Sequence, residues 1–446
     1  MTNRRVHLCL RALSIAGLLE TRVGYGIYVA VFRRTVMTTG VPTHSTAQAT
    51  GGPAGRAALK LAAVLLVAGC LRPALTSVGP VLDLIGADTG LSNTALGVLG
   101  ALPLFAFAVL SPLVHVPSRR FGAEPVVLWA LAALAGGIVM RSLPGIAWLW
   151  AGTVVVGGAI AVGNVLLPSI IKRDHPGDLS RVTGIYTAVM TGFAALASGV
   201  AVPIAAATGN SWRWSLAVWA GLAVVAVAVW AMRMRVPRAA TVAASAAWSA
   251  GEKPMWRSAV AWQVTLFMGL QSTTFYLLAN WLPAIETAHG VNPSTAGWHL
   301  FLFHAVGIIS GLAVIAVMGG RTDQRAAGVL VSVPMATAMA GMLWAPGWSP
   351  AWAVLAGTSA GSAIVVALAL IGLRTSSHLQ TAQLSGMALS VGYLLAAIGP
   401  SAAGWLADRS GTWTPVLVLV AVLALAQVVV ALWAGRDRYT HPETTA

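Results

Sequence analysis

The chain has 446 residues, of which 57% are hydrophobic and only 9% charged. Soluble domains carry about a quarter charged residues, so this composition excludes a water-soluble protein with an ordinary polar surface. The formal net charge of +15 would suggest nucleic-acid binding in a soluble protein. The two cysteines, Cys9 and Cys70, lie in the N-terminal tail and in an apolar run, which argues against a disulfide framework or a cysteine metal site.

The first 57 residues differ from the rest of the chain. They hold two apolar runs that are too short to span a bilayer. The first of these runs resembles a signal peptide, but no small-residue cleavage site follows it. Residues 37–57 are rich in Thr, Gly, Ala and Pro, a composition typical of disorder. We interpret residues 1–57 as a cytoplasmic tail, and translation from Met37 is an alternative.

Twelve apolar runs follow, each long enough to cross the roughly 30 Å core of a bilayer as a helix. Helices satisfy their own backbone hydrogen bonds in lipid. The longest polar loop, at 234–258, is predicted to be a cytoplasmic linker between halves at 58–233 and 259–434, and 435–446 is a second cytoplasmic tail. The predicted spans lie near 59–80, 93–115, 125–142, 147–171, 182–207, 213–233, 259–283, 296–318, 326–344, 351–373, 383–407 and 413–434.

The basic residues predict the orientation of these spans. Most of the 27 Lys and Arg lie in the tails and in the alternate loops on the same side as the tails. Cytoplasmic loops are enriched in this way, so both termini are predicted to be cytoplasmic. In the outer loops we place only Arg141, Arg213 and Arg409, and Arg72 falls within a span. The excess positive charge therefore reflects topology, and we predict no nucleic-acid partner.

The two halves repeat one another at an offset of 202 residues. Lys172 then falls on Arg374, at the inner ends of spans 4 and 10, and Arg119 falls on Arg321, in the loops after spans 2 and 8. Two parallel repeats of six helices are typical of major facilitator transporters. The predicted fold class is therefore an all-α membrane protein with twelve transmembrane helices in two parallel six-helix repeats.

The first span carries a motif that resembles a known family. Residues 71–80, Leu-Arg-Pro-Ala-Leu-Thr-Ser-Val-Gly-Pro, are similar to the first-span signature of the cyanate and nitroimidazole transporter family, a bacterial branch of the major facilitator superfamily. Two departures are Cys70, where many members have Asn, and a loop after span 2 that lacks the usual acid. The resemblance implies a permease for cyanate-like or nitroimidazole-like compounds in a bacterial cytoplasmic membrane. Three further segments look similar to the family: 163–173, 269–283 and 384–394.

Arg72 is the most informative residue in the spans. It lies roughly thirteen residues into the first span, where a charge costs a few kcal/mol or more. The spans offer no convincing carboxylate partner, and we expect Asp83 and Glu286, at outer span ends, to meet water. A substrate anion is the expected partner, because guanidinium pairs with planar anions. The alternative is a structural arginine bonded to backbone carbonyls of a helix broken at Pro73.

Other polar residues within the spans are candidates for the same site. The predicted substrate-binding residues are Arg72, Asn164, Gln271, Tyr276, Tyr186 and Tyr393. For all but Arg72 the alternative is helix packing, to which polar side chains also contribute. His304, a histidine deep in a span, is the candidate for proton coupling, again with packing as the alternative. The predicted inner gate residues are Lys172, Arg374, Arg120 and Asp323.

These features predict a secondary transporter that moves a small anion or polar organic compound by alternating access. Its partners are the substrate, the lipid bilayer and a proton as co-substrate, and we expect a monomer with no cofactor or metal. The absence of a Gly-Lys-Ser/Thr nucleotide loop argues against an ATP-driven pump. The alternatives are a multidrug or xenobiotic exporter, an intramembrane enzyme and a membrane sensor. The exporter is disfavoured by the missing intramembrane carboxylates, the enzyme by the lack of a catalytic cluster, and the sensor by the lack of a soluble signalling domain.

Overall fold

The computed structural model describes residues 53–175, 178–234 and 255–440. Met37 and most of the tail that we expected to be disordered lie outside these residues, as does most of the linker at 234–258. The stretch 53–57, which we placed in that tail, forms the first turns of a helix that begins at Pro53.

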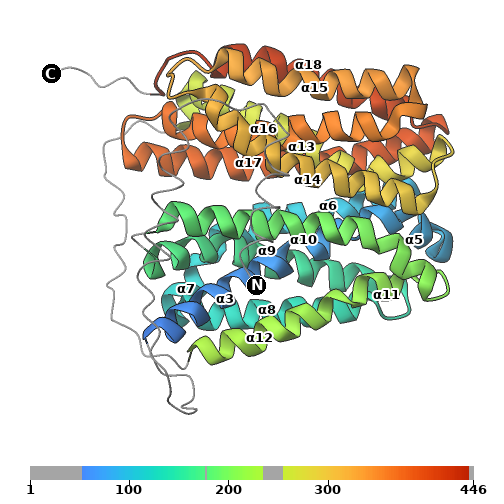
Figure 1. Ribbon diagram of the computed structural model, residues 1–446, viewed down its shortest axis with the longest axis horizontal. Helices are drawn as coiled ribbons and strands as arrows, with labels where there is room; N and C mark the ends of the chain where they lie inside the picture. The colour runs from blue at the N-terminus through green and yellow to red at the C-terminus, as the bar shows by residue number, and fades with distance from the viewer. Residues whose placement is uncertain (1–52, 176–177, 235–254, 441–446) are drawn as a thin grey trace, which may run out of the picture. The chain divides into compact units, whose positions relative to one another are not determined.

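The first half of the chain forms one helical bundle, coloured blue to green in Figure 1. Its first predicted span is divided into four pieces: α3 (Pro53–Leu71), α4 (Pro73–Thr76), η1 (Gly79–Val81) and α5 (Leu82–Thr89). The other elements are α6 (Asn93–Leu110), η2 (Ser111–Leu113), α7 (His115–Phe121), α8 (Ala123–Arg141), α9 (Ile146–Asp174), α10 (Leu179–Ala207), α11 (Trp212–Ala217) and α12 (Trp219–Met234).

The second half forms a similar bundle, coloured yellow to red in Figure 1. It begins with a short turn, η3 (Met255–Arg257), that leads into a long helix. Its elements are α13 (Ala259–Ala288), α14 (Pro293–Met318), α15 (Arg325–Trp344), η4 (Pro346–Trp348), α16 (Ser349–Leu373), α17 (His378–Ser410) and α18 (Thr414–Ala434).

Eleven helical segments among the described residues are long and apolar enough to cross a membrane. The remaining predicted span corresponds to α13, which is also long enough at 30 residues. α13 is less apolar because polar side chains are buried along it. These are Thr265, Gln271, Ser272, Thr273, Thr274, Asn280 and Glu286. The predicted all-helical membrane fold is confirmed, and α13 carries a row of buried polar side chains.

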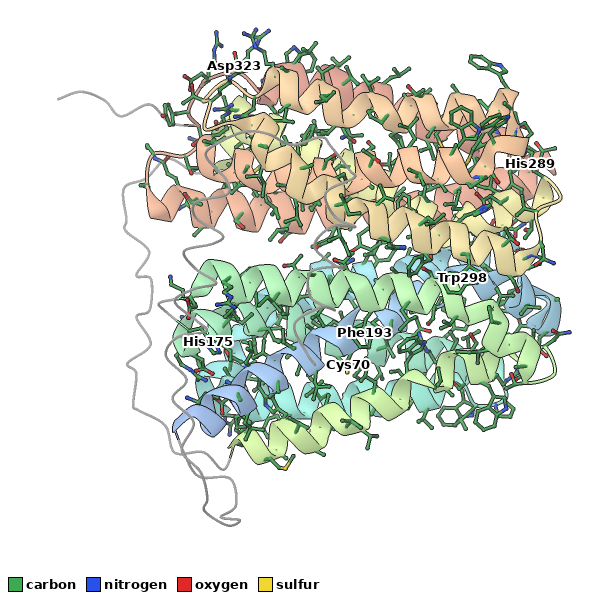
Figure 2. All side chains as sticks on the ribbon, viewed as in Figure 1. Cys70, His175, Phe193, His289, Trp298 and Asp323 are labelled. Atoms are coloured by element: carbon green, nitrogen blue, oxygen red, sulfur yellow. The ribbon has the colours of Figure 1, made fainter. Side chains whose placement is uncertain are left out.

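Figure 2 shows His289 and Trp298 toward one end of the bundles, and His175 and Asp323 toward the other. Following the predicted topology, we call the end with His289 the outer end and the end with Asp323 the inner end. Helix boundaries at the outer end follow the local sequence. Ser92 Oγ caps α6, and Gly90, with φ of 70°, ends α5 in the left-handed conformation that favours glycine.

The two halves pack together through α6 against α17 and α10 against α14. Gly97 permits close approach, because a Cβ there would lie only 2.3 Å from the carbonyl oxygen of Pro400. Near the same contact, the Asp408 carboxylate at the end of α17 accepts hydrogen bonds from the backbone N–H groups of Asn93 (3.1 Å) and Thr94 (2.7 Å). Asp408 thus binds the first turn of α6 from the opposite half.

A hydrophobic core at the outer end is shared by both halves. It joins Val81 and Leu99 of the first half to Leu277, Trp281 and Leu300 of the second. The halves therefore share a continuous, closely packed apolar contact at this end, and van der Waals packing of this kind holds helices together in lipid.

An ion-pair network holds the inner end of the first half. Arg233 of α12 is buried and pairs with Asp174 of α9. Arg173 pairs with Glu124 of α8 at 2.5 Å, and the Trp230 indole Nε1 donates to the Glu124 carbonyl oxygen at 3.0 Å. Opposite charges on three helices are thereby neutralised where they leave the apolar region.

Candidate functional site

The first span is interrupted at Arg72. Pro73 has no backbone N–H and begins the short helix α4, so α3 ends at Leu71. The Arg72 carbonyl oxygen accepts from the N–H groups of Leu75 and Thr76, at 2.9 and 3.0 Å. Among the described residues, no backbone carbonyl accepts from the Arg72 side chain, although the structural alternative required such bonds.

The Arg72 guanidinium instead reaches toward the second half. Its Nη1 lies 3.4 Å from the Tyr276 hydroxyl on α13, at the long limit for a hydrogen bond. The side chain is partly buried, and no carboxylate of the described residues forms an ion pair with it. A cation that lies between the halves with only a neutral partner is suited to bind an anion.

Aromatic rings from both halves gather at this contact. The Tyr276 ring packs edge-on against Tyr393 of α17, with centroids 6.3 Å apart. Tyr393 also meets Phe107 of α6 at 5.8 Å. Tyr186 of α10 is buried and lies within electrostatic range of Arg72. The structure therefore brings three predicted tyrosines together near Arg72.

His304 on α14 lies beside the same aromatic group. Its ring packs edge-on against Phe275 and Phe303, with centroids 5.7 and 5.3 Å away. Nδ1 lies 2.8 Å from the Leu300 carbonyl oxygen, so the proton of the neutral ring belongs on Nδ1. Nε2 is buried without a partner among the described residues. The coupling role of His304 stays a prediction.

The two amide candidates are not joined to Arg72. Gln271 is buried on α13, where its Nε2 donates to Ser272 Oγ at 2.7 Å and lies 3.5 Å from Met268 Sδ. Asn164 on α9 is partly buried, and its side chain makes no hydrogen bond to another described residue. Substrate roles for both residues stay predictions.

Arg374, a predicted gate residue, is buried at the end of α16. Its guanidinium donates to the carbonyl oxygens of Thr322, Ala434 and Gly435, at 2.8, 2.9 and 2.9 Å. These bonds fasten three segments of the second half to one another at the inner end. The burial that desolvates the guanidinium also lowers the pKa of Arg374 from its usual value.

The other predicted gate residues lie on the inner surface. Asp323 pairs with Arg325 at 2.7 Å, and the hydrogen bonds from Arg325 hold the pKa of the Asp323 carboxyl below its usual value. Lys172 is exposed. Arg120 is also exposed and lies over the ring of its neighbour Phe121 at 5.1 Å. Within the described residues these four candidates form no hydrogen bond with the opposite half, and their gating role stays a prediction.

Arg141 was expected in an outer loop, and this expectation is wrong. The residue ends α8 with 1% of its surface exposed. Its Nη1 donates to the Ala74 carbonyl oxygen at 2.6 Å. In a regular helix the Ala74 carbonyl oxygen would accept from the N–H of Val78. That N–H donates instead to the Leu75 carbonyl oxygen at the end of the broken helix, so the Ala74 oxygen needs another donor. Arg141 therefore holds the segment that follows Arg72.

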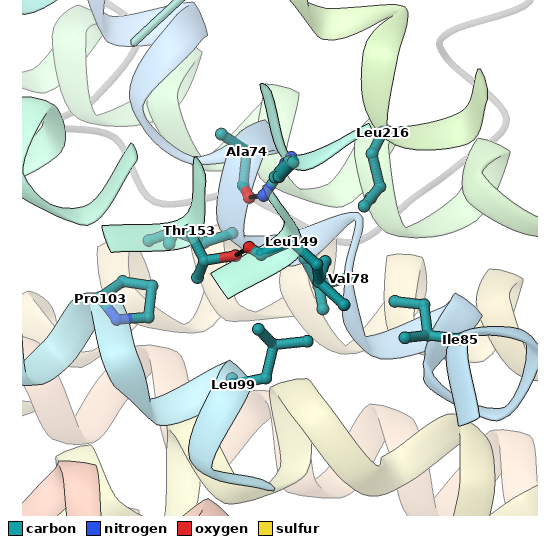
Figure 3. Close-up of a pocket in the computed structure, with 11 residues that line it drawn as sticks. Ala74, Val78, Ile85, Leu99, Pro103, Leu149, Thr153 and Leu216 are labelled. Carbon is teal, nitrogen blue, oxygen red and sulfur yellow. Dashed lines mark hydrogen bonds between the residues drawn. The ribbon is translucent and has the colours of Figure 1, made fainter. Parts of the chain in front are cut away.

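A small cavity lies beside this bond (Figure 3). Ala74, Val78, Leu99, Pro103 and Thr153 are among its lining residues. The space open to the centre of a water molecule is about 10 Å³, so the cavity can hold about one water molecule. The Nε and Nη2 atoms of Arg141, which also lines the cavity, have no partner among the described residues. Arg141 stands at the end of an apolar run in the sequence, and nothing in that position predicts that its side chain is buried.

Glu286 also differs from expectation. We expected it to meet water at an outer span end, but only 2% of its surface is exposed. Its Oε2 lies 2.9 Å from Nδ1 of His299 on α14. The described residues contain no group of three or more His, Cys, Asp or Glu that could hold a metal ion. Glu286 and His299 therefore form a buried ionisable pair that links α13 to α14.

Comparisons with known proteins agree with this architecture. Residues 64–377 match the Major Facilitator Superfamily. The chain is 39% identical to the 2-nitroimidazole transporter of Escherichia coli (strain K12) over 378 residues, which are 85% of this chain and 95% of that protein. It is 27% identical to the cyanate transport protein CynX of the same organism over 360 residues, 79% of this chain and 91% of that protein.

The fold is similar to that of solved structures with much lower sequence identity. A bacterial homologue of the human lysosomal transporter Spinster, in an inward-facing and unoccupied conformation, superimposes with a TM-score of 0.72 at 16% identity. The match covers 88% of this chain and all of that one. The family resemblance and the fold class predicted from the sequence are both confirmed.

Proposed function

The chain belongs to the Major Facilitator Superfamily of membrane transporters, and on that premise we propose that it is a secondary transporter for a small anionic or polar compound. The substrate binds between the halves at Arg72 and meets each side of the membrane in turn as the halves rock. The protein acts as a monomer in the bacterial cytoplasmic membrane, with both termini inside, as the distribution of basic residues predicts.

The observation that carries the proposal is the unpaired charge of Arg72. Its hydrogen-bond partner among the described residues is a neutral hydroxyl at 3.4 Å. A charge at this depth costs a few kcal/mol or more without a counter-charge, and a bound anion supplies one. The guanidinium offers parallel N–H groups that match a pair of acceptor oxygens.

The surrounding rings narrow the substrate class. Tyr276 contacts Arg72 and packs against Tyr393, and Tyr186 is buried in the same region. The flat, partly polar rings of tyrosine favour a flat heterocycle as ligand. A nitro group on such a ring presents two oxygens to the guanidinium. Because relatives carry the names of 2-nitroimidazole and cyanate transporters, 2-nitroimidazole is the first ligand to test and cyanate the second.

The test is ligand-dependent thermal stabilisation of the purified full-length protein. A ligand at about 100 times its Kd raises the stability of the folded state by about 2.7 kcal/mol. We expect stabilisation of the wild type, loss of it in Arg72→Ala, and a partial loss in Tyr276→Phe. Arg213→Ala is the matched control, because it removes a guanidinium that pairs with Asp88 at the outer end.

Two results would contradict the proposal in different ways. Equal stabilisation of the wild type and a folded Arg72→Ala variant would place the binding site elsewhere and leave Arg72 with a structural role. Failure of both compounds to stabilise the wild type would reject the substrate class.

A further inference from the structure

A pair of ionisable side chains is buried in the second half, toward the outer end and away from Arg72. Only 2% of the Glu286 side chain and 10% of the His299 side chain are exposed. Glu286 Oε2 lies 2.9 Å from His299 Nδ1, a hydrogen-bonding distance. The second carboxylate oxygen, Oε1, is buried without a partner among the described residues. Ionisable pairs inside a membrane bundle are costly, and they commonly mark proton or ion pathways.

The groups that face this pair carry little charge. Ser349 of α16 places its Oγ 3.5 Å from His299 Nδ1. His289 follows the last residue of α13 and is exposed. Its Nδ1 lies 2.7 Å from the Ile285 carbonyl oxygen. Within the described residues, no arginine or lysine forms an ion pair with Glu286. His299 is therefore the ionisable group in direct contact with the buried carboxylate.

The pair also borders a contact between the two halves. Thr287, the residue after Glu286, donates its hydroxyl to the Asp83 carboxylate of α5 at 3.2 Å. Tyr276 lies ten residues earlier on the same helix, or about 15 Å away at 1.5 Å per residue. Helix α13 thus connects the Arg72 site, the ionisable pair and an outer contact between the halves.

We propose that Glu286 and His299 form the proton-binding site of this transporter, and that protonation of the pair controls opening of the outer end. The inference rests on the proposed transport function and adds the ion that drives it. His304 is less suited to this role, because its Nδ1 is bonded to the Leu300 carbonyl and it has no carboxylate partner among the described residues.

Loading the site adds one proton and breaks no covalent bond. Before loading, the carboxylate is ionised and the imidazole is neutral, with its Nδ1–H donated to Oε2. The pair then carries one net negative charge. The proton enters from the outer side through His299, which is the more exposed member, and makes the pair neutral overall. After the halves have rocked to open toward the inner side, the proton leaves to that side and the pair regains its negative charge.

The first experiment compares two kinds of transport in proteoliposomes of the full-length protein, with labelled 2-nitroimidazole and labelled cyanate. Exchange at equal pH on both sides needs no net proton movement, whereas accumulation against a gradient does. A gradient of one pH unit supports at most about tenfold accumulation for one coupled proton. Glu286→Gln and His299→Gln should keep exchange and lose this accumulation. His289→Gln, the matched histidine control, should keep both.

The second experiment needs no substrate. Ala87 on α5 and Ala288 on α13 are exposed at the outer end of opposite halves. Both are replaced by cysteine and spin-labelled, with Cys9 replaced by serine, while the buried Cys70 stays. In nanodiscs, acidification should change the distance between the labels in the wild type and in His289→Gln. In Glu286→Gln the distance should not respond to pH.

Several outcomes would overturn the inference. One is pH-driven accumulation in Glu286→Gln and His299→Gln at the wild-type level. Another is a wild type that exchanges substrate but accumulates none under a pH gradient, which would leave the proposed function intact. A third is an unaltered pH response of the label distance in Glu286→Gln. If neither compound is exchanged by the wild type, the proposed substrate class fails, and the label distance alone decides the proton site.

Discussion

Replacing Gly97 with alanine is expected to open the outer end without unfolding the protein. The new Cβ would lie 2.3 Å from the Pro400 carbonyl oxygen and 2.9 Å from its carbonyl carbon, whereas ordinary contact begins at 3.4 Å. Both atoms belong to the backbone of α17, so no side chain can rotate away to make room. Helices α6 and α17 must therefore separate by about 1.1 Å, the difference between the contact distance and the available space.

The size of the effect follows from where the contact lies. Overpacking costs typically about 1–3 kcal/mol. The strained contact lies between the two halves. When the halves separate at the outer end, the contact is broken and the overpacking energy is no longer incurred. The ratio of outer-open to outer-closed protein should then rise about 5- to 150-fold. The Asp408 bonds to Asn93 and Thr94, near the same contact, should be lost in the open state.

The assay is the distance between spin labels at Ala87 and Ala288, measured at constant pH. Gly361→Ala is the matched control, because its Cβ would lie 2.0 Å from the Gly307 carbonyl oxygen inside the second half. That variant should lose thermal stability with no change in label distance. If Gly97→Ala lowers the thermal midpoint as much as the control and leaves the label distance unchanged, the contact between the halves is a fixed part of the fold and the reasoning is refuted.

Two further predictions concern buried arginines. Arg141→Met should lose about 1–3 kcal/mol of stability, because it leaves the Ala74 carbonyl unpaired; ligand stabilisation should weaken as well, since Ala74 lies two residues from Arg72. Arg233→Met should cost about 1.5–3 kcal/mol, because it removes one of the two arginine partners of Asp174 and leaves Arg173 at 2.8 Å, with ligand stabilisation unchanged. Thermal midpoints with and without 2-nitroimidazole check both predictions, and a wild-type midpoint in either variant would contradict its stated role.

The spans could be predicted because their signal is local. An apolar run of about 20 residues must be a helix in lipid, whatever its neighbours are. Local patterns did not predict where a spanning helix breaks or which way the side chains at its end point. The first span was predicted to end near residue 80, yet it breaks at Arg72 and continues to Thr89. The side chain of Arg141 turns inward because a carbonyl on the broken helix lacks a donor, and that carbonyl belongs to another span.

The same distinction separates the site residues that meet from those that do not. Arg72, Tyr276 and Tyr393 share a depth in their spans, and the structure joins them across the halves. Gln271 was selected by the same reasoning, but its amide is bonded to Ser272 on its own helix. The depth of a residue within its span can be predicted from the sequence. The direction in which its side chain points depends on how the helices pack. For that reason Glu286, at a span end, was expected in water and is buried.

The low apolarity of α13 follows from its position in the fold. A helix that faces lipid must be apolar around much of its surface, but one enclosed by other helices can carry polar groups where partners are available. α13 packs against α14, α16, α17 and α18 of its own half and against η1 of the other. Its polar residues therefore meet protein. A helix in this position contacts groups of both halves. The proposed proton site at Glu286 and the proposed substrate site at Tyr276 lie on this one helix, so the proposed coupling between them requires no further moving part.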